Sequence, residues 1–95
     1  MTTLDVPEMV SNDSKAAEVL RAFILGDGRL VIIHPPKVFD NPAAWGILCA
    51  DLVRHVCNAC IELGEDNPLE KIVEIFNAEI TDPTSPWAGR LVRKQ

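Results

Sequence analysis

The stretch GDGRLVIIHPP, residues 26–36, decides the fold class. Four aliphatic residues, 30–33, lie between a glycine-rich turn and two prolines, and three of the four are β-branched. Such a continuous apolar run favours a strand that is covered on both faces. Pro35 and Pro36 end it, because each removes a backbone donor and restricts the residue before it. Helical patterns flank this strand, so we expect an α+β domain.

One helix is predicted before the strand. Between residues 16 and 25, apolar residues recur at three- and four-residue spacing, which is typical of one face of an amphipathic helix: Ala16, Val19, Leu20, Phe23 and Ile24. The polar residues 12–14 suit its start, and the glycines of GDG suit its end. We therefore expect a helix that ends where the turn begins.

Two helices are predicted after the strand. Asn41 and Pro42 are a typical cap and first residue, so a long helix should run from Pro42 to about Leu63, with Gly64 at its exit. A second helix should begin at 67–70, where NPLE offers a cap and a capping-box-like glutamate. Its apolar stripe is Leu69, Ile72, Val73, Phe76 and Ile80.

The predicted order is thus helix, strand, long helix, helix, in one small domain over 1–95 with irregular or docking termini at 1–13 and 83–95. A single strand leaves its backbone groups unpaired. Either the N-terminal TLDV, residues 3–6, pairs with it, or a second chain does, since exposed strand edges are templates for pairing. In the tail, Trp87 and the pair Leu91–Val92 are apolar, so we expect the tail to dock.

Composition narrows the class of protein. The chain has 95 residues, 47% hydrophobic and 24% charged, as in ordinary globular domains. It shows no secretory signal and no uncharged apolar run of membrane-spanning length, so we expect a cytoplasmic protein without a membrane partner. The net charge is −5 and bases cluster only in the tail RLVRKQ, 90–95, which disfavours nucleic-acid binding. The odd count of three cysteines disfavours a disulfide framework.

The segment RHVCNAC, 54–60, holds Cys57 and Cys60 in a C-x-x-C spacing. On one rigid helix His55 and Cys60 cannot converge on a metal ion, which needs its ligands about 2.0–2.3 Å away. Reactive C-x-x-C pairs normally lie at a helix N-terminus, and this pair lies far inside the predicted helix. We therefore favour packing for both cysteines, and keep a metal site with ligands from elsewhere, or a redox role, as alternatives.

Five other side chains are candidates for a ligand site. Asp51 and His55 are four residues apart, so a carboxylate could orient an imidazole on the helix surface. Arg54 could bind a carboxylate, and Trp45 could stack on a ligand. A structural role is nevertheless the simpler interpretation of the Asp51–His55 pair, and packing is the simpler interpretation of Trp45. His34 lies at the strand end, beside loops that often carry sites.

The segment 40–60 carries a family resemblance. The pattern D-x-P-A-A-W-G followed by D-L-x-R-H-V occurs at residues 40–46 and 51–56. It resembles a family of uncharacterised bacterial domains of about a hundred residues, chiefly proteobacterial. The resemblance implies a bacterial cytosolic protein and no assigned activity. The family's pattern carries the aspartate, arginine and histidine but does not call for cysteines at 57 and 60, which weakens a family-wide metal role.

The first functional hypothesis is a non-enzymatic interaction or regulatory module that acts as a homodimer and needs no cofactor, with an unknown protein as a second candidate partner. The alternative is a small-ligand binding protein or enzyme with a site near Trp45, Asp51, Arg54 and His55. A metal-binding protein that uses Cys57 and Cys60 comes third.

Overall fold

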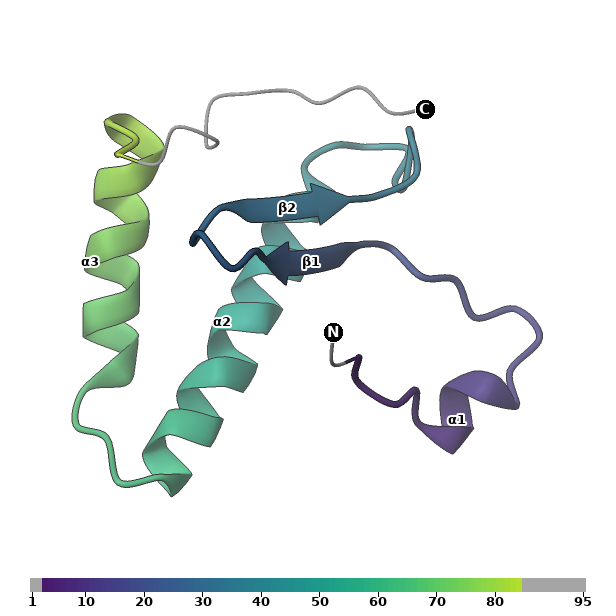
Figure 1. Cartoon of the computed structure of the whole chain (residues 1–95), viewed down its shortest axis with the longest axis horizontal. Helices are drawn as coiled ribbons and strands as arrows, with labels where there is room; N and C mark the ends of the chain where they lie inside the picture. Colours follow the sequence, from purple (N-terminus) through teal and green to yellow (C-terminus); the bar gives the residue numbers. More distant parts are fainter. Residues whose placement is uncertain (1–2, 85–95) are drawn as a thin grey trace. The chain divides into compact units, whose positions relative to one another are not determined.

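The structure, a computed structural model, describes residues 3–84. Its contacts divide the chain into two compact units, Met1–Pro36 and Lys37–Gln95. The first unit contains α1 (Glu8–Ser11), β1 (Arg21–Ile24) and β2 (Leu30–Ile33), and the second contains α2 (Ala44–Glu62) and α3 (Pro68–Thr81) (Figure 1). The predicted α+β class is confirmed, with the order short helix, antiparallel hairpin, two longer helices. The predicted docking of Trp87 and Leu91–Val92 lies outside the described residues.

The strands β1 and β2 form a two-stranded antiparallel hairpin. Arg21 lies opposite Ile33, and Ile24 lies opposite Leu30. The side chains on one face therefore include Phe23 and Val31, and those on the other include Ile24 and Leu30, because successive residues of a strand point to opposite faces. Both faces of β2 are apolar.

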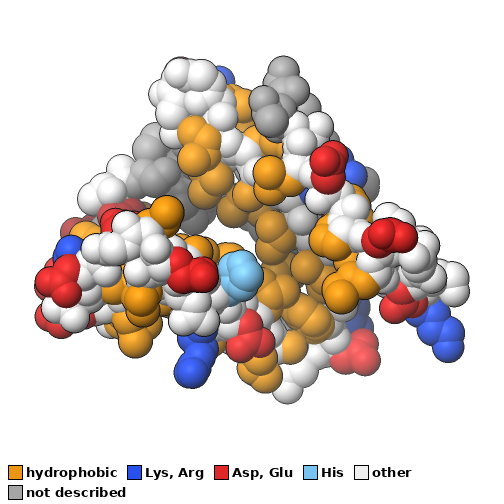
Figure 2. Space-filling view, turned by 90° about the horizontal axis from the view of Figure 1, so that it is seen from below, with side chains coloured by type: hydrophobic (Ala, Val, Ile, Leu, Met, Phe, Trp, Pro, Cys, Tyr) orange, Lys and Arg blue, Asp and Glu red, His pale blue; other side chains and the backbone are white. Residues whose placement is uncertain are grey.

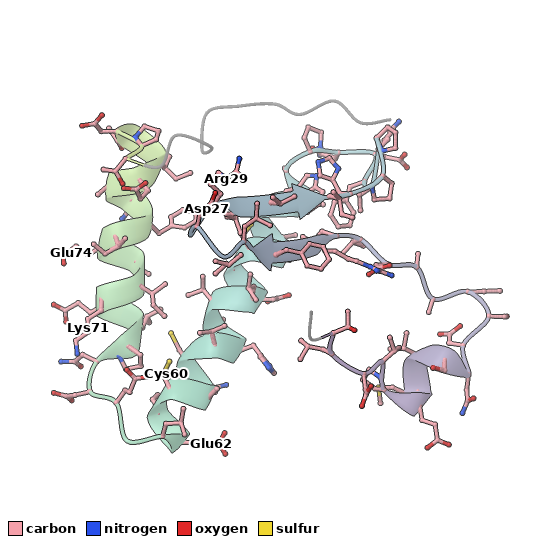
Figure 3. All side chains as sticks on the ribbon, viewed as in Figure 1. Asp27, Arg29, Cys60, Glu62, Lys71 and Glu74 are labelled. Carbon is pink, nitrogen blue, oxygen red and sulfur yellow. The ribbon has the colours of Figure 1, made fainter. Side chains whose placement is uncertain are left out.

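The GDG sequence is the hairpin turn. The Leu25 N–H donates to the Arg29 carbonyl at 2.8 Å, and the Gly28 N–H donates to the Leu25 carbonyl at 2.9 Å. Gly28 has φ of 90°, in the left-handed region that glycine enters without steric cost. Asp27 closes the turn: its carboxylate accepts from the Arg29 backbone N–H at 3.1 Å and from Arg29 Nε at 2.8 Å (Figure 3). These contacts are all local in sequence.

The helix predicted over 16–25 is wrong. Residues 16–20 have no regular structure, and 21–24 form β1. Cross-strand pairs such as Phe23 with Val31 hold this segment extended. The helical spacing covered only ten residues, a length at which periodicity does not separate a helix from a strand.

The N-terminal predictions also need correction. Residues 3–6 form no strand, so TLDV does not pair with β2. Residues 12–14 start no helix: the one helical turn of the region, α1, ends at Ser11, and the N–H of Asn12 donates to the Glu8 carbonyl at 2.9 Å. Asp13 instead accepts from the Lys15 backbone N–H at 2.8 Å, a local contact that competes with helix formation.

The long helix agrees closely with its prediction. It begins at Ala44, two residues later than expected, and Asn41 Oδ1 accepts from the Ala43 N–H at 2.9 Å, as a cap would. It ends at Glu62, and Gly64 follows with φ of 86°. Two backbone bonds close this end, from Gly64 N–H to the Ile61 carbonyl at 2.9 Å and from Glu65 N–H to the Cys60 carbonyl at 3.0 Å.

The last helix starts at Pro68 as predicted, but without the predicted capping box. Asn67 has φ of 51°, a left-handed conformation, and its side chain makes no cap hydrogen bond. The Asn67 carbonyl accepts from the Lys71 N–H at 3.3 Å. Asparagine is one of the few residues besides glycine that adopt this conformation readily, so Asn67 directs the chain into the helix through its backbone.

Helices α2 and α3 lie side by side as an antiparallel pair (Figure 1). Cys57 on α2 and Pro68 at the start of α3 are the buried residues of the region 3–84. Sequence analysis expected β2 to be covered on both faces, yet in the single chain its four residues are 37–50% exposed. Within one chain that expectation is wrong, because the hairpin unit is by itself a single thin layer and a sheet face is buried only where another layer packs on it.

Candidate functional site

Trp45 stands in the first turn of α2 and packs against an aromatic ring. Its centroid is 5.2 Å from that of Phe39, and the planes meet edge to face at 79°. This is a preferred geometry of aromatic pairs. Both side chains are half-buried. The contact links the start of α2 to the loop before it, which is the packing role expected of Trp45.

The polar candidates of α2 do not form a prepared site. Asp51, Arg54 and His55 are all exposed, and within residues 3–84 no side-chain hydrogen bond or ion pair joins any of them to another group. Trp45 and His55 are ten residues apart, about 15 Å along the helix axis. The helix thus brings Asp51, Arg54 and His55 to neighbouring positions and leaves Trp45 distant, so the four do not converge on one small ligand.

The two cysteines of the C-x-x-C differ in environment. Cys57 is 6% exposed and Cys60 is half-buried, on the side of α2 that faces α3 (Figure 3). The Glu65 carboxylate accepts a hydrogen bond from the Cys60 thiol and raises the pKa of Cys60, with a smaller contribution from burial. A raised pKa disfavours the thiolate, the form that ligates metals and attacks disulfides. Residues 3–84 contain no group of three His, Cys, Asp or Glu placed to hold a metal ion.

His34 lies in the hairpin unit, apart in sequence from the α2 candidates. Its Nδ1 is 2.7 Å from the Pro35 carbonyl oxygen. His34 lines an open hollow of about 230 Å³, together with Glu18, Leu20, Arg21, Ile33 and Pro35. The hollow is small and open to solvent, and its lining combines two charged side chains with apolar ones.

Sequence analysis missed the ion pair in this hollow. Arg21 Nε lies 2.5 Å from Glu18 Oε2. The hydrogen bond from Arg21 lowers the pKa of the Glu18 carboxyl, and the same bond raises the pKa of Arg21. Both side chains are more than half exposed, so the pair contributes little to stability. The signal in the sequence was the pair of opposite charges three residues apart, at positions 18 and 21.

The dominant surface feature is apolar. Twenty large hydrophobic side chains of the described region are exposed, and hydrophobic groups occupy much of the face shown in Figure 2. In the hairpin they include all of β2. On α3 they form a line at spacings of four, three and four residues, which we name the α3 stripe: Leu69, Val73, Phe76 and Ile80, 40–70% exposed. Single exposed apolar residues are ordinary, whereas contiguous ones mark interaction surfaces.

By length and composition alone, α2 could also cross a membrane. It carries Asp51 and Arg54 near its middle, however, and charged residues at the centre of a bilayer are costly. Its apolar and charged residues therefore suit an interface with protein on one side and water on the other.

Comparison with known proteins gives a family and no activity. A solved structure described as a "putative pyruvate dehydrogenase" from the photosynthetic bacterium Rhodopseudomonas palustrus CGA009 is 35% identical, with a TM-score of 0.74; the match covers 100% of this chain and 97% of that one. The comparison with curated proteins finds no match. The family described as Domain of unknown function (DUF5076) matches residues 3–84. The resemblance seen in the D-x-P-A-A-W-G pattern is thereby confirmed, and the chain belongs to the DUF5076 family of bacterial domains.

Proposed function

We propose that the chain is a non-enzymatic interaction module that works as a homodimer in the bacterial cytoplasm. The observation that carries the proposal is the balance of apolar groups: in residues 3–84, twenty large hydrophobic side chains are exposed, and Cys57 is the one buried hydrophobic residue besides Pro68. Burial of apolar surface is the main favourable contribution to folding. A two-stranded hairpin is only marginally stable unless one of its faces is covered. A helix pair whose apolar stripes are exposed likewise buries too little apolar surface.

A second copy is the partner that these faces suit best. A standard interface uses about 20–30 residues on each side, and the described region offers twenty exposed large apolar residues. Most oligomers of a single kind of chain close with two-fold symmetry, in which the same patch serves on both copies. Wide apolar faces with few convergent polar groups support association rather than catalysis.

The first test is the mass of the assembly. Native mass spectrometry and light scattering over about a hundredfold range of concentration should give a species of twice 10.5 kDa that dissociates on dilution. A monomer at every concentration would contradict the proposal. A chain that leaves solution for lipid vesicles and forms no dimer would contradict it too, and would favour the membrane interpretation of α2.

A matched pair of variants locates the apolar contribution. Phe76 is 45% exposed on the α3 stripe, whereas Glu74 points away from α2 on the same helix (Figure 3). Phe76→Gln should weaken dimerisation by about tenfold or more, because burying a phenylalanine is worth about 1.5–3 kcal/mol. Glu74→Gln should leave the dissociation constant unchanged. Equal effects of the two changes would remove the α3 stripe from the interface.

A second candidate function is an enzyme or ligand-binding protein that acts on a small carboxylate. The similarity to the protein described as a "putative pyruvate dehydrogenase" favours it. Arg54 and His55 are the groups of α2 that could bind a carboxylate. Titration of the labelled protein with pyruvate, followed by NMR, should then give saturable shifts at Arg54 and His55. Shifts scattered over the chain, or none, would leave the interaction module as the better hypothesis.

A further inference from the structure

The unpaired edge of β2 has a self-complementary backbone pattern. The Leu25 N–H bonds to the Arg29 carbonyl, so Leu25 and Arg29 are a hydrogen-bonded pair. Hydrogen-bonded and non-hydrogen-bonded pairs alternate along an antiparallel ladder, so Val31 and Ile33 bond to β1. The N–H and carbonyl groups of Leu30 and Ile32 then point to the opposite edge. In the described chain the sheet has two strands, so no third strand meets them.

We propose that β2 pairs antiparallel with β2 of a second copy, about a two-fold axis at Val31; this inference rests on the proposed homodimer. Leu30 then lies opposite Ile32 of the second copy, and Ile32 lies opposite its Leu30. Each of these pairs exchanges two hydrogen bonds, which gives four backbone bonds across the axis. With the axis at Ile32 instead, Ile32 would face Ile32 of the second copy, and this one pair would supply only two backbone bonds between strand residues. The Val31 register is therefore favoured. The product is one four-stranded sheet, β1-β2-β2-β1.

The β2 edge suits this role and the β1 edge does not. β2 has no charge, proline or bulge within Leu30–Ile33, the devices that proteins use to protect an exposed edge. β1 begins at Arg21, which is ion-paired to Glu18. The N-terminal residues 3, 4 and 6 line a hollow of about 330 Å³ together with β1 residues and with no β2 residue, so the N-terminal segment stands beside β1.

The pairing also accounts for the apolar side chains of the hairpin. Leu30, Val31, Ile32 and Ile33 are 37–50% exposed in the single chain, and both faces of β2 are apolar. In the four-stranded sheet β2 becomes a central strand, and its apolar side chains gain cross-strand neighbours from the second copy on both faces.

Cross-linking tests the register directly. Val31 would face Val31 of the second copy in a non-hydrogen-bonded pair, with Cα atoms about 4.5 Å apart, within the range of a disulfide. Val31→Cys should therefore form a 31–31 disulfide under mild oxidation, identified by peptide mass spectrometry apart from the native cysteines. In the matched control Ile32→Cys, the two Cα atoms would be about 8 Å apart, beyond that range. A disulfide in the control, and none at position 31, would overturn the proposal.

Amide exchange on the unmodified protein provides the second test, which does not depend on a variant that could fail to fold. The Leu30 and Ile32 amides should be protected at high concentration and lose about tenfold or more of that protection on dilution. Val31 and Ile33, which bond to β1, serve as internal references. A dimer in which Leu30 and Ile32 exchange as exposed amides would overturn the shared strand and leave the homodimer standing. A monomer at every concentration would overturn both.

Discussion

At the scale of single residues, Asn67 is the one residue other than glycine with positive φ in the described chain. Asn67→Ala should lower the free energy of unfolding by about 1 kcal/mol, because a β-carbon without the asparagine side chain disfavours the left-handed region. Asn67→Gly should change it by less than about half of that amount. Urea unfolding measures both.

The matched control is Asn58→Ala, at an exposed position inside α2, where alanine is the better helix former. It should be neutral or slightly stabilising. If Asn67→Ala behaved like Asn58→Ala, the backbone conformation assigned to Asn67 would be wrong.

Cys60 and Glu65 give a prediction with a pH signature. The Glu65 carboxylate raises the pKa of Cys60, so the thiolate forms at a higher pH than in a free thiol. Glu65→Gln removes the negative charge, and alkylation of Cys60 should then begin at a lower pH and run faster near neutrality. Peptide mass spectrometry after iodoacetamide treatment gives the rate at each pH.

Glu62→Gln is the control for this measurement, because Glu62 is an exposed carboxylate near the same helix end and does not affect the pKa of Cys60. The Cys60 rate profile should be unchanged in that variant. A profile that moved equally in both variants would point to the general charge of the segment instead of the Glu65 contact.

Local chemistry was the most predictable part of the molecule. Asn41, Pro68 and Gly64 were assigned to helix ends from the sequence, and the structure places each of them at or beside one. The capping role of Asn67 failed because a side chain type that suits a cap also suits a left-handed backbone. The sequence contains no signal that separates these two uses of asparagine.

At the scale of elements, the hairpin turn depends on one glycine. Gly28 has φ of 90°, and a β-carbon built there would meet no atom within 4 Å. Gly28→Ala should therefore destabilise the hairpin by about 1–2 kcal/mol through backbone strain alone. Exchange of the Val31 and Ile33 amides, which report on pairing with β1, is the measurement.

Gly26→Ala is the natural comparison in the same turn. A β-carbon at Gly26 also meets no atom within 4 Å, and its φ is not in the left-handed region. Its effect on hairpin exchange should be small. Similar losses in the two variants would mean that the turn conformation does not depend on the left-handed residue.

The second strand was the element that sequence reasoning missed. Residues 22–25 and 30–33 are apolar runs separated by the four residues GDGR, which is itself a hairpin pattern. The spacing of Val19, Leu20, Phe23 and Ile24 fitted a helix equally well, and pairing with β2 decided the outcome. β2 could be predicted from its own residues, whereas the residues of β1 fitted a helix or a strand, and the tertiary contact with β2 made them a strand.

At the scale of the whole molecule, stability should depend on the concentration of the chain. If folding and dimerisation are linked, each tenfold increase in concentration should add about 1.4 kcal/mol to the apparent stability of the dimer. Thermal unfolding followed by circular dichroism should show a midpoint that rises with concentration. A constant midpoint over about a hundredfold range would contradict the linkage.

The candidate site shows where sequence reasoning stops. Helical spacing correctly places Asp51, Arg54 and His55 on one helix, because spacing along a helix is fixed by its geometry. Whether a second element meets them depends on contacts that no local pattern encodes. The burial of α2 shows the same difficulty: Leu52 is 55% exposed, whereas Cys57 is buried. Which side of a helix is covered depends on its neighbours.

Within each unit the contacting elements are close in the sequence, and this has a consequence for the rate of folding. Paired residues of the hairpin are only six to twelve positions apart, and five residues join α2 to α3. A hairpin forms in about 1–10 μs and a helix in about 1 μs or less, so each unit can form as soon as its last residue leaves the ribosome. At about 1 μM, association at a typical rate of about 10⁶ M⁻¹s⁻¹ takes about a second. If the chain dimerises as proposed, a newly made copy spends about that second as a monomer whose marginally stable units form and open repeatedly, and this is the interval in which chaperones can bind it.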